Sequence, residues 1–165
     1  MAEPTPPASP SAAPRSHVAQ LNVGRAVGPL DSHVMAPFVA LLDAINAAGE
    51  ATPGFVWRLQ GDGGNATDVL VSDDPRLIVN LTVWETIEQL HTFTYRSDHG
   101  PIYARRREWF EVPAAPTLVL WWIPAGTVPS ATEAMARLAL LRAHGPTPDA
   151  FTFKQRFPPP AGDAS

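Results

Sequence analysis

Two short stretches of this chain place polar and aromatic side chains at every second position, which is the spacing of one face of a β-strand. In AQLNV at 19–23 and in LIVNLTVW at 77–84, apolar side chains alternate with amide, hydroxyl or indole side chains. Aromatic area gives a small molecule affinity, and a few polar groups fix its orientation. The candidate substrate-binding residues are therefore Gln20, Asn22, Asn80, Thr82 and Trp84.

Two further strands add side chains to the same face. The stretch PGFVWRLQ supplies either Trp57 or the pair Arg58 and Gln60, so Arg58 joins the candidate substrate-binding residues. The stretch TLVLWWI supplies either Trp121 or Trp122, and the sequence leaves this choice open. The four strands are predicted at 17–23, 53–60, 77–84 and 117–123.

One histidine is the candidate catalytic residue. A histidine is the usual general acid–base near neutral pH, and His99 is our choice for that role. His91 stands eight residues earlier, across the interruption RSDHGP, which is a poor spacing for two metal ligands on one helix, and no metal site is predicted. The absence of cysteine excludes disulfides, thiolate metal sites and cysteine nucleophiles.

Length and composition narrow the class of protein. A chain of 165 residues fits one domain, predicted at 17–157, between disordered tails at 1–16 and 158–165 that are rich in proline and alanine. The net charge of −4 argues against a nucleic-acid partner, and the run Arg105 to Arg107 is interpreted as a solvated helix face. No apolar window is long enough for a membrane span, and no signal-peptide pattern is present, so we expect a cytoplasmic protein.

Helices are predicted between the strands from apolar spacing and capping signals. Thr86 with Gln89, and Ser130 with Glu133, have the spacing of capping boxes. The resulting order, β-α-β-β-α-α-β-α, indicates a ferredoxin-like split βαβ arrangement of the α+β class, with an antiparallel sheet and all helices on one face. We expect the apolar positions of the strands to face these helices, and the candidate residues to face a ligand or a second subunit. Those apolar positions are Ala19, Leu21, Val23, Leu77, Val79, Leu81 and Val83.

Six stretches together resemble the bacterial DUF3291 family, over about residues 17–157. They are HVAQLNVGR, PGFVWRLQ, DDPRLIVNLTVWET, YRSDHGPIYARRREWF, LVLWWIPAG and LLRAHGPTPDAFTF. That family is similar to the dimeric α+β barrel superfamily, which includes antibiotic-biosynthesis monooxygenases and haem-degrading monooxygenases. The resemblance implies a homodimer whose two sheets meet. It implies no particular reaction, because proteins of this fold carry out different chemistry.

Three functions stay open at this point. The first is a small-molecule-binding protein that oxidises an aromatic or polyketide-like substrate without a cofactor, with Asn22, Asn80 and Trp84 holding the substrate. The second is a non-catalytic ligand-binding or accessory protein. The third is a haem-binding enzyme with His99 near the expected ligand region, although Phe93 and Tyr103 stand where the haem-degrading relatives have tryptophan and histidine.

Overall fold

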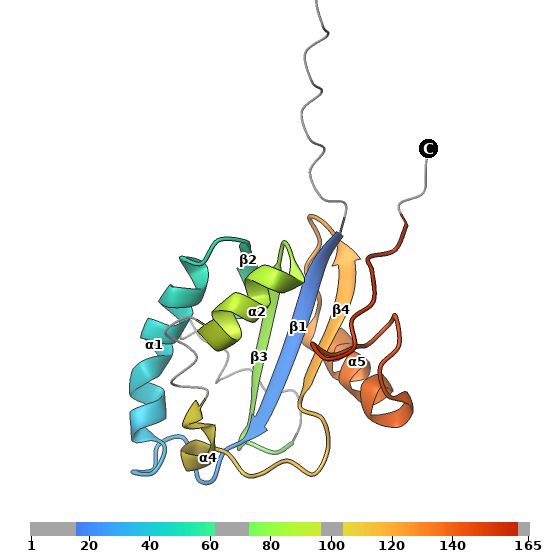
Figure 1. Ribbon diagram of the computed structural model, residues 1–165. Helices are drawn as coiled ribbons and strands as arrows, with labels where there is room; N and C mark the ends of the chain where they lie inside the picture. Colours follow the sequence, from blue (N-terminus) through green and yellow to red (C-terminus); the bar gives the residue numbers. More distant parts are fainter. Residues whose placement is uncertain (1–15, 62–72, 97–103, 162–165) are drawn as a thin grey trace, which may run out of the picture.

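The computed structural model describes residues 16–61, 73–96 and 104–161, which form an antiparallel four-stranded sheet with helices on both sides (Figure 1). The sheet has the order β2-β3-β1-β4. Its strands are β1 Ser16–Arg25, β2 Phe55–Arg58, β3 Leu77–Trp84 and β4 Leu118–Pro124. The helices are α1 Ala36–Glu50, α2 Ile87–Arg96, α4 Arg106–Trp109 and α5 Ala131–His144.

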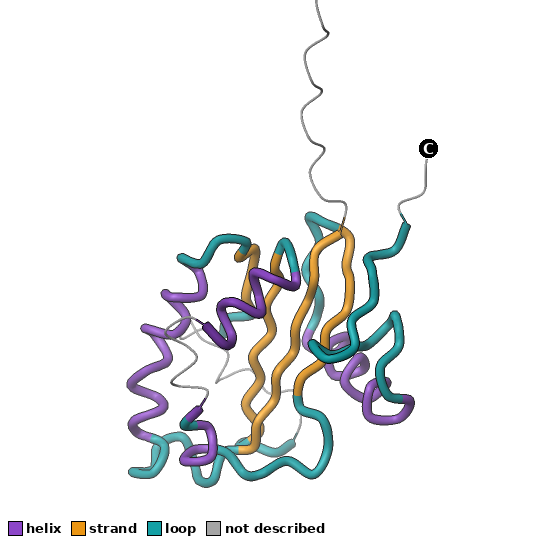
Figure 2. The backbone as a smooth tube through the Cα atoms, in the orientation of Figure 1, coloured by secondary structure: helices purple, strands orange, loops and turns teal. Residues whose placement is uncertain are grey.

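The order of these elements confirms the predicted α+β class and the split βαβ arrangement. β3 lies between β2 and β1, in agreement with the lack of turn residues in its sequence, and β1 pairs with both β3 and β4 (Figure 2). The register places Asn22 opposite Asn80 and Gln20 opposite Thr82. The amide and hydroxyl residues of two strands distant in sequence therefore meet at the middle of the sheet.

The helix N-termini in the structure show which of the capping signals in the sequence form hydrogen bonds. The Ser130 hydroxyl accepts a hydrogen bond from the Glu133 backbone N–H at 3.0 Å, and the Thr86 hydroxyl accepts one from the Gln89 N–H at 3.2 Å, so both predicted caps are confirmed. By contrast, α1 begins after Met35 without a side-chain cap, although Asp31 and Ser32, residue types that favour helix N-caps, precede it in the sequence.

Several predicted boundaries differ from the structure. β1 begins at Ser16, one residue before the predicted domain start, because Ser16 pairs with Pro124 at the edge of the sheet. The sequence AFTFKQRF at 150–157 indicates a short edge strand, but this segment makes two isolated bridges instead, between Phe151 and Leu120 and between Ala150 and Thr147. The remainder of the predicted tails, at 1–15 and 162–165, lies outside the described residues.

The prediction that all helices cover the apolar face of the sheet is right for α5 and wrong for α1 and α2. Leu138 and Leu141 of α5 pack on the apolar face, with Leu21 and Leu81. α1 and α2 instead pack on the opposite face, where Ile45 and Leu90 belong to the same cluster as Trp84 and Leu120. Strand alternation assigned the residues to two faces correctly, but alternation alone does not tell which helix covers which face.

The face that carries the candidate residues is therefore the one beneath α1 and α2, and we call it the mixed face. The register also settles the two open choices. Trp122 lies in the mixed-face cluster and Trp121 in the apolar one. Arg58 is opposite Thr82, on the mixed face, whereas Trp57 packs against the apolar cluster.

None of the helices in the three described stretches is long and apolar enough to cross a membrane.

Two leucines of α5 test whether this helix covers the apolar face. Leu138 is 1% exposed and Leu140 is 40% exposed. Replacing Leu138 by alanine should lower the free energy of unfolding by about 2–5 kcal/mol, because it leaves a cavity in the core. Leu140→Ala, the matched control, should change it by no more than about 0.5 kcal/mol. Urea unfolding of both variants gives the comparison, and equal losses would contradict the placement of α5.

Candidate functional site

The buried part of the mixed face is joined by a chain of hydrogen bonds. The Trp84 indole N–H donates to the Thr82 hydroxyl at 2.9 Å, and the Thr82 hydroxyl donates to the Gln20 side-chain carbonyl at 2.8 Å. Gln20 and Thr82 are 6% and 7% exposed, and Trp84 is fully buried. Buried polar groups are costly unless they are paired, so this chain explains why the face tolerates polar residues there.

Aromatic rings from two elements hold Trp84 in place. Phe93 of α2 stacks on it with ring centroids 5.2 Å apart, and Phe55 of β2 meets it edge-on at 5.5 Å. Such offset and edge-to-face pairs add to the burial of the rings. Trp84 is therefore a fixed wall of the site, and its N–H is already engaged by Thr82.

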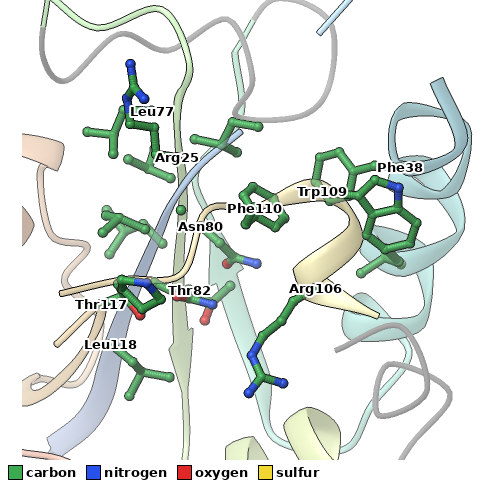
Figure 3. Close-up of a pocket in the computed structure, with 18 of the residues that line it drawn as sticks. Arg25, Phe38, Leu77, Asn80, Thr82, Arg106, Trp109, Phe110, Thr117 and Leu118 are labelled. Carbon is green, nitrogen blue, oxygen red and sulfur yellow. The ribbon is translucent and has the colours of Figure 1, made fainter. Parts of the chain in front are cut away.

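The side chains of Asn22 and Asn80 are not part of this buried chain of hydrogen bonds. They are directly opposite each other in the register, which brings their Cβ atoms to about 4.5–5.5 Å. Asn80 is exposed and Asn22 is half-buried. Neither side-chain amide hydrogen-bonds to another residue within 16–61, 73–96 or 104–161. Figure 3 shows the Asn80 amide directed away from its strand, on the side of the sheet where α4 lies.

A cavity of about 820 Å³ opens beside these two amides. Its described lining comes mainly from the mixed face, α1, α2 and the segment from α4 to β4, and it also reaches apolar-face residues such as Val79 and Leu81. The volume falls within the range of small-molecule sites. Six of the described lining residues are aromatic, namely Phe38, Phe55, Trp84, Phe93, Trp109 and Phe110.

The α4 segment forms one wall of this cavity. Trp109 is 2% exposed and packs on Phe38 of α1, with ring centroids 5.6 Å apart. The Phe110 ring lies against Gly24, where an added Cβ would come within 2.7 Å of it, so glycine is needed for this close approach. Figure 3 shows Phe110 beside Asn80, and Trp109 directed toward Phe38 of α1.

A second, much smaller cavity of about 20 Å³ lies between the sheet and α2. It shares Asn22, Asn80 and Thr82 with the large cavity, and Gln20 and Thr94 add further polar groups. This size suits a single water molecule with several polar partners. The two amides thus stand between a large aromatic cavity and a small polar one.

Ion pairs surround the site. Arg58 lines the cavity and pairs with Glu50 at 2.7 Å, with its own side chain 14% exposed. Arg25 pairs with both Asp74 and Glu111 at 2.6 Å. The hydrogen bond from Arg25 is the main cause that lowers the pKa of the Asp74 carboxyl below its ordinary value.

The structure brings together all six predicted substrate-binding residues, because each lines one or both cavities. The predicted catalytic residue, His99, lies outside the described residues, so its role stays a prediction. No histidine is among the described lining residues, and within those stretches no three His, Cys, Asp or Glu side chains are arranged to hold a metal ion.

Sequence reasoning missed the contribution of α4. The arginine run was interpreted as a solvated helix face, yet Arg106 and Arg107 line the cavity as well as being exposed. The signal available was the stretch RRREWF, in which two large aromatic residues, Trp109 and Phe110, closely follow the arginines.

The two kinds of polar residue on the mixed face should respond differently to mutation. Thr82→Val should lower the free energy of unfolding by about 1–3 kcal/mol, because it leaves the Trp84 N–H and the Gln20 carbonyl buried without a partner. Asn80→Ala should change stability little, because Asn80 is exposed. Urea unfolding measures both, and a large loss for Asn80→Ala would show that this amide serves packing.

Comparison with known proteins gives a family and several remote structural likenesses. Residues 17–165 match the family described as "Domain of unknown function (DUF3291)". No curated protein matches the chain in sequence.

Three solved structures represent those likenesses. SnoaB, a cofactor-independent oxygenase from Streptomyces nogalater, is 17% identical with a TM-score of 0.46, over 70% of this chain and 99% of its own. PA3566 from Pseudomonas aeruginosa is 12% identical with a TM-score of 0.45, over 71% and 100%. Rv0793 from Mycobacterium tuberculosis is 18% identical with a TM-score of 0.42, over 71% and 100%. Likeness at this level carries no argument about chemistry.

Proposed function

This chain belongs to the DUF3291 family, and we propose that it binds a planar aromatic or polyketide-like small molecule in the cavity beside Asn22 and Asn80. The observation that carries the proposal is the pairing of these two amides on neighbouring strands, next to a cavity whose described lining includes six aromatic residues. Rings supply apolar contact area, and amides supply donors and acceptors that orient a carbonyl or hydroxyl group.

The reaction proposed for this site is oxidation of the bound aromatic molecule by dioxygen without a cofactor. In such a reaction an activated ring carbon takes one oxygen atom, and the other oxygen atom leaves as water with two hydrogens of the substrate. The negative charge that develops on a substrate oxygen needs hydrogen-bond donors fixed in advance. The Asn22 and Asn80 side-chain N–H groups are suited to that task, because the rigid sheet holds both strands in register.

Two alternatives use the same cavity differently. A non-catalytic binding protein would need the rings and the amides but no reaction. A haem-binding enzyme would need an axial ligand, and the predicted candidate, His99, lies outside the described residues. We favour the aromatic ligand because the described lining offers rings, amides and arginines.

A homodimer is also proposed, on the family resemblance alone. Trp84 does not require a second chain to cover it, because it is fully buried within one chain. The half-buried apolar residues Trp57, Leu59 and Leu77 on the apolar face are the candidate contact surface. Light scattering should give twice the 17.7 kDa mass of one chain at micromolar concentration, and the mass of a single chain would overturn the dimer.

Binding of a neutral aromatic probe tests the proposed function. 2-Naphthol should bind the intact protein, as measured by isothermal titration calorimetry. Asn80→Ala should weaken this binding by about 1–3 kcal/mol, the cost of a lost buried hydrogen bond. Lack of binding, or equal binding by the variant, would contradict the proposed site.

Oxygen consumption then separates the enzyme from the accessory protein. With anthrone as the substrate and a chelator present, the enzyme should take up dioxygen faster than buffer does, and Asn80→Ala should be slower. If the protein binds these molecules without faster oxygen uptake, the non-catalytic alternative is favoured.

A further inference from the structure

The small cavity between the sheet and α2 adjoins the large one. The side chains of Asn22, Asn80 and Thr82 line both cavities, so the two cavities meet at these residues. The small cavity is thus a side pocket of the large one, on the mixed face of the sheet. The described residues that line the small cavity and not the large one are Gln20, Leu90 and Thr94.

Three polar side chains of this side pocket are more than nine-tenths buried. Gln20 is 6% exposed, Thr82 is 7% exposed and Thr94 is 8% exposed. A buried polar group is costly unless it has a partner. The Thr94 hydroxyl donates to the Leu90 carbonyl at 2.9 Å, one turn earlier on α2, so its oxygen lone pairs remain as acceptors for a further hydrogen bond.

The hydrogen-bond chain through Thr82 determines what Gln20 offers to the side pocket. The Trp84 indole N–H can only donate, so the Thr82 hydroxyl accepts from it and gives its own hydrogen to Gln20. The Gln20 atom that receives this hydrogen, at 2.8 Å, is therefore the side-chain oxygen. The Gln20 NH₂ group makes no hydrogen bond to any other residue within 16–61, 73–96 or 104–161, and it remains a donor for an oxygen atom in the pocket.

The volume of the side pocket, about 20 Å³, limits what it can hold. A single water molecule needs at least about 10–15 Å³ of such space, so one oxygen atom fits there and a methoxy or carboxylate group does not. A hydroxyl group has the size of a water molecule and can both accept and donate a hydrogen bond. An apolar group of the same size would leave the buried polar groups without partners, which lowers affinity.

We propose that the side pocket is a subsite for one hydroxyl group of the aromatic ligand, which accepts a hydrogen bond from the Gln20 NH₂ group and donates one to the Thr94 oxygen. The Asn22 and Asn80 amides flank the ligand where the two cavities meet. The inference rests on the proposed binding function and deepens it, because it makes the ligand a phenol and assigns Gln20 and Thr94 a role in specificity.

Four ligands with the same ring system test this subsite in the unmodified protein. 2-Naphthol carries a hydroxyl, 2-methylnaphthalene carries an apolar group of similar size, 2-methoxynaphthalene carries an oxygen capped by a methyl group, and naphthalene has no substituent. Isothermal titration calorimetry should show that 2-naphthol binds about tenfold more tightly than each of the other three, the ratio that about 1.4 kcal/mol gives.

Two variants locate this preference at the side pocket. Gln20→Met removes the NH₂ donor, and Thr94→Ile adds one carbon atom that fills the space. Each should remove most of the preference for 2-naphthol over naphthalene and leave naphthalene binding unchanged, because neither residue is among the described lining of the large cavity. Gln155→Met is the matched control at an exposed position that lines neither cavity, and it should keep the preference.

Thr94→Ile also protects the test against a loss of folding. Gln20→Met removes the acceptor of the Thr82 hydroxyl, whereas Thr94→Ile leaves the chain from Trp84 to Gln20 intact. Unchanged naphthalene binding shows that the large cavity of a variant is preserved. The preference of Thr94→Ile therefore decides the result if Gln20→Met does not fold.

The possible results separate the subsite from the proposed function. If 2-methylnaphthalene or 2-methoxynaphthalene binds as tightly as 2-naphthol, the hydroxyl subsite is overturned and the aromatic cavity stands. A preference for 2-naphthol that survives in Thr94→Ile overturns its assignment to the side pocket. If none of the four ligands binds, the proposed function itself fails, and the inference fails with it.

Discussion

The hydrogen bond from the Trp84 indole to the Thr82 hydroxyl is the constraint on which the site depends. It allows a large aromatic residue and two polar residues, Thr82 and Gln20, to be buried together beneath α1 and α2. Because these groups satisfy one another, the inner end of the mixed face is closed and rigid. Asn22 and Asn80, further along the same strands, have no such partners within the described residues and border the open cavity.

Strand alternation predicted the strands well, and for a physical reason. In β3, Leu77 to Trp84, side chains point to opposite faces in turn, so polar and apolar residues separate by parity alone. The candidate set Gln20, Asn22, Asn80, Thr82 and Trp84 followed from this parity. The caps at Ser130 and Thr86 were equally predictable, because each depends on residues only three positions apart.

What the sequence did not predict depends on contacts between distant segments. Parity does not reveal that α1 and α2 cover the mixed face, since their apolar residues Ile45 and Leu90 would suit either side of the sheet. The role of α4 was hidden because Arg106 and Arg107 resemble an ordinary solvated run. Their place beside the cavity arises when Trp109 packs on Phe38, a contact between residues far apart in the chain.

The central claim is that the Asn22 and Asn80 amides contact an aromatic ligand whereas the Trp84 indole does not donate to it. The most direct measurement is a titration of ¹⁵N-labelled protein with 2-naphthol, followed by NMR of the assigned side-chain N–H signals. The Asn22 and Asn80 signals should shift, and the signal of the exposed Gln155 should not. The Trp84 N–H should keep its slow exchange with solvent, because Thr82 holds it. Saturation with ligand while both asparagine signals stay in place would contradict the account.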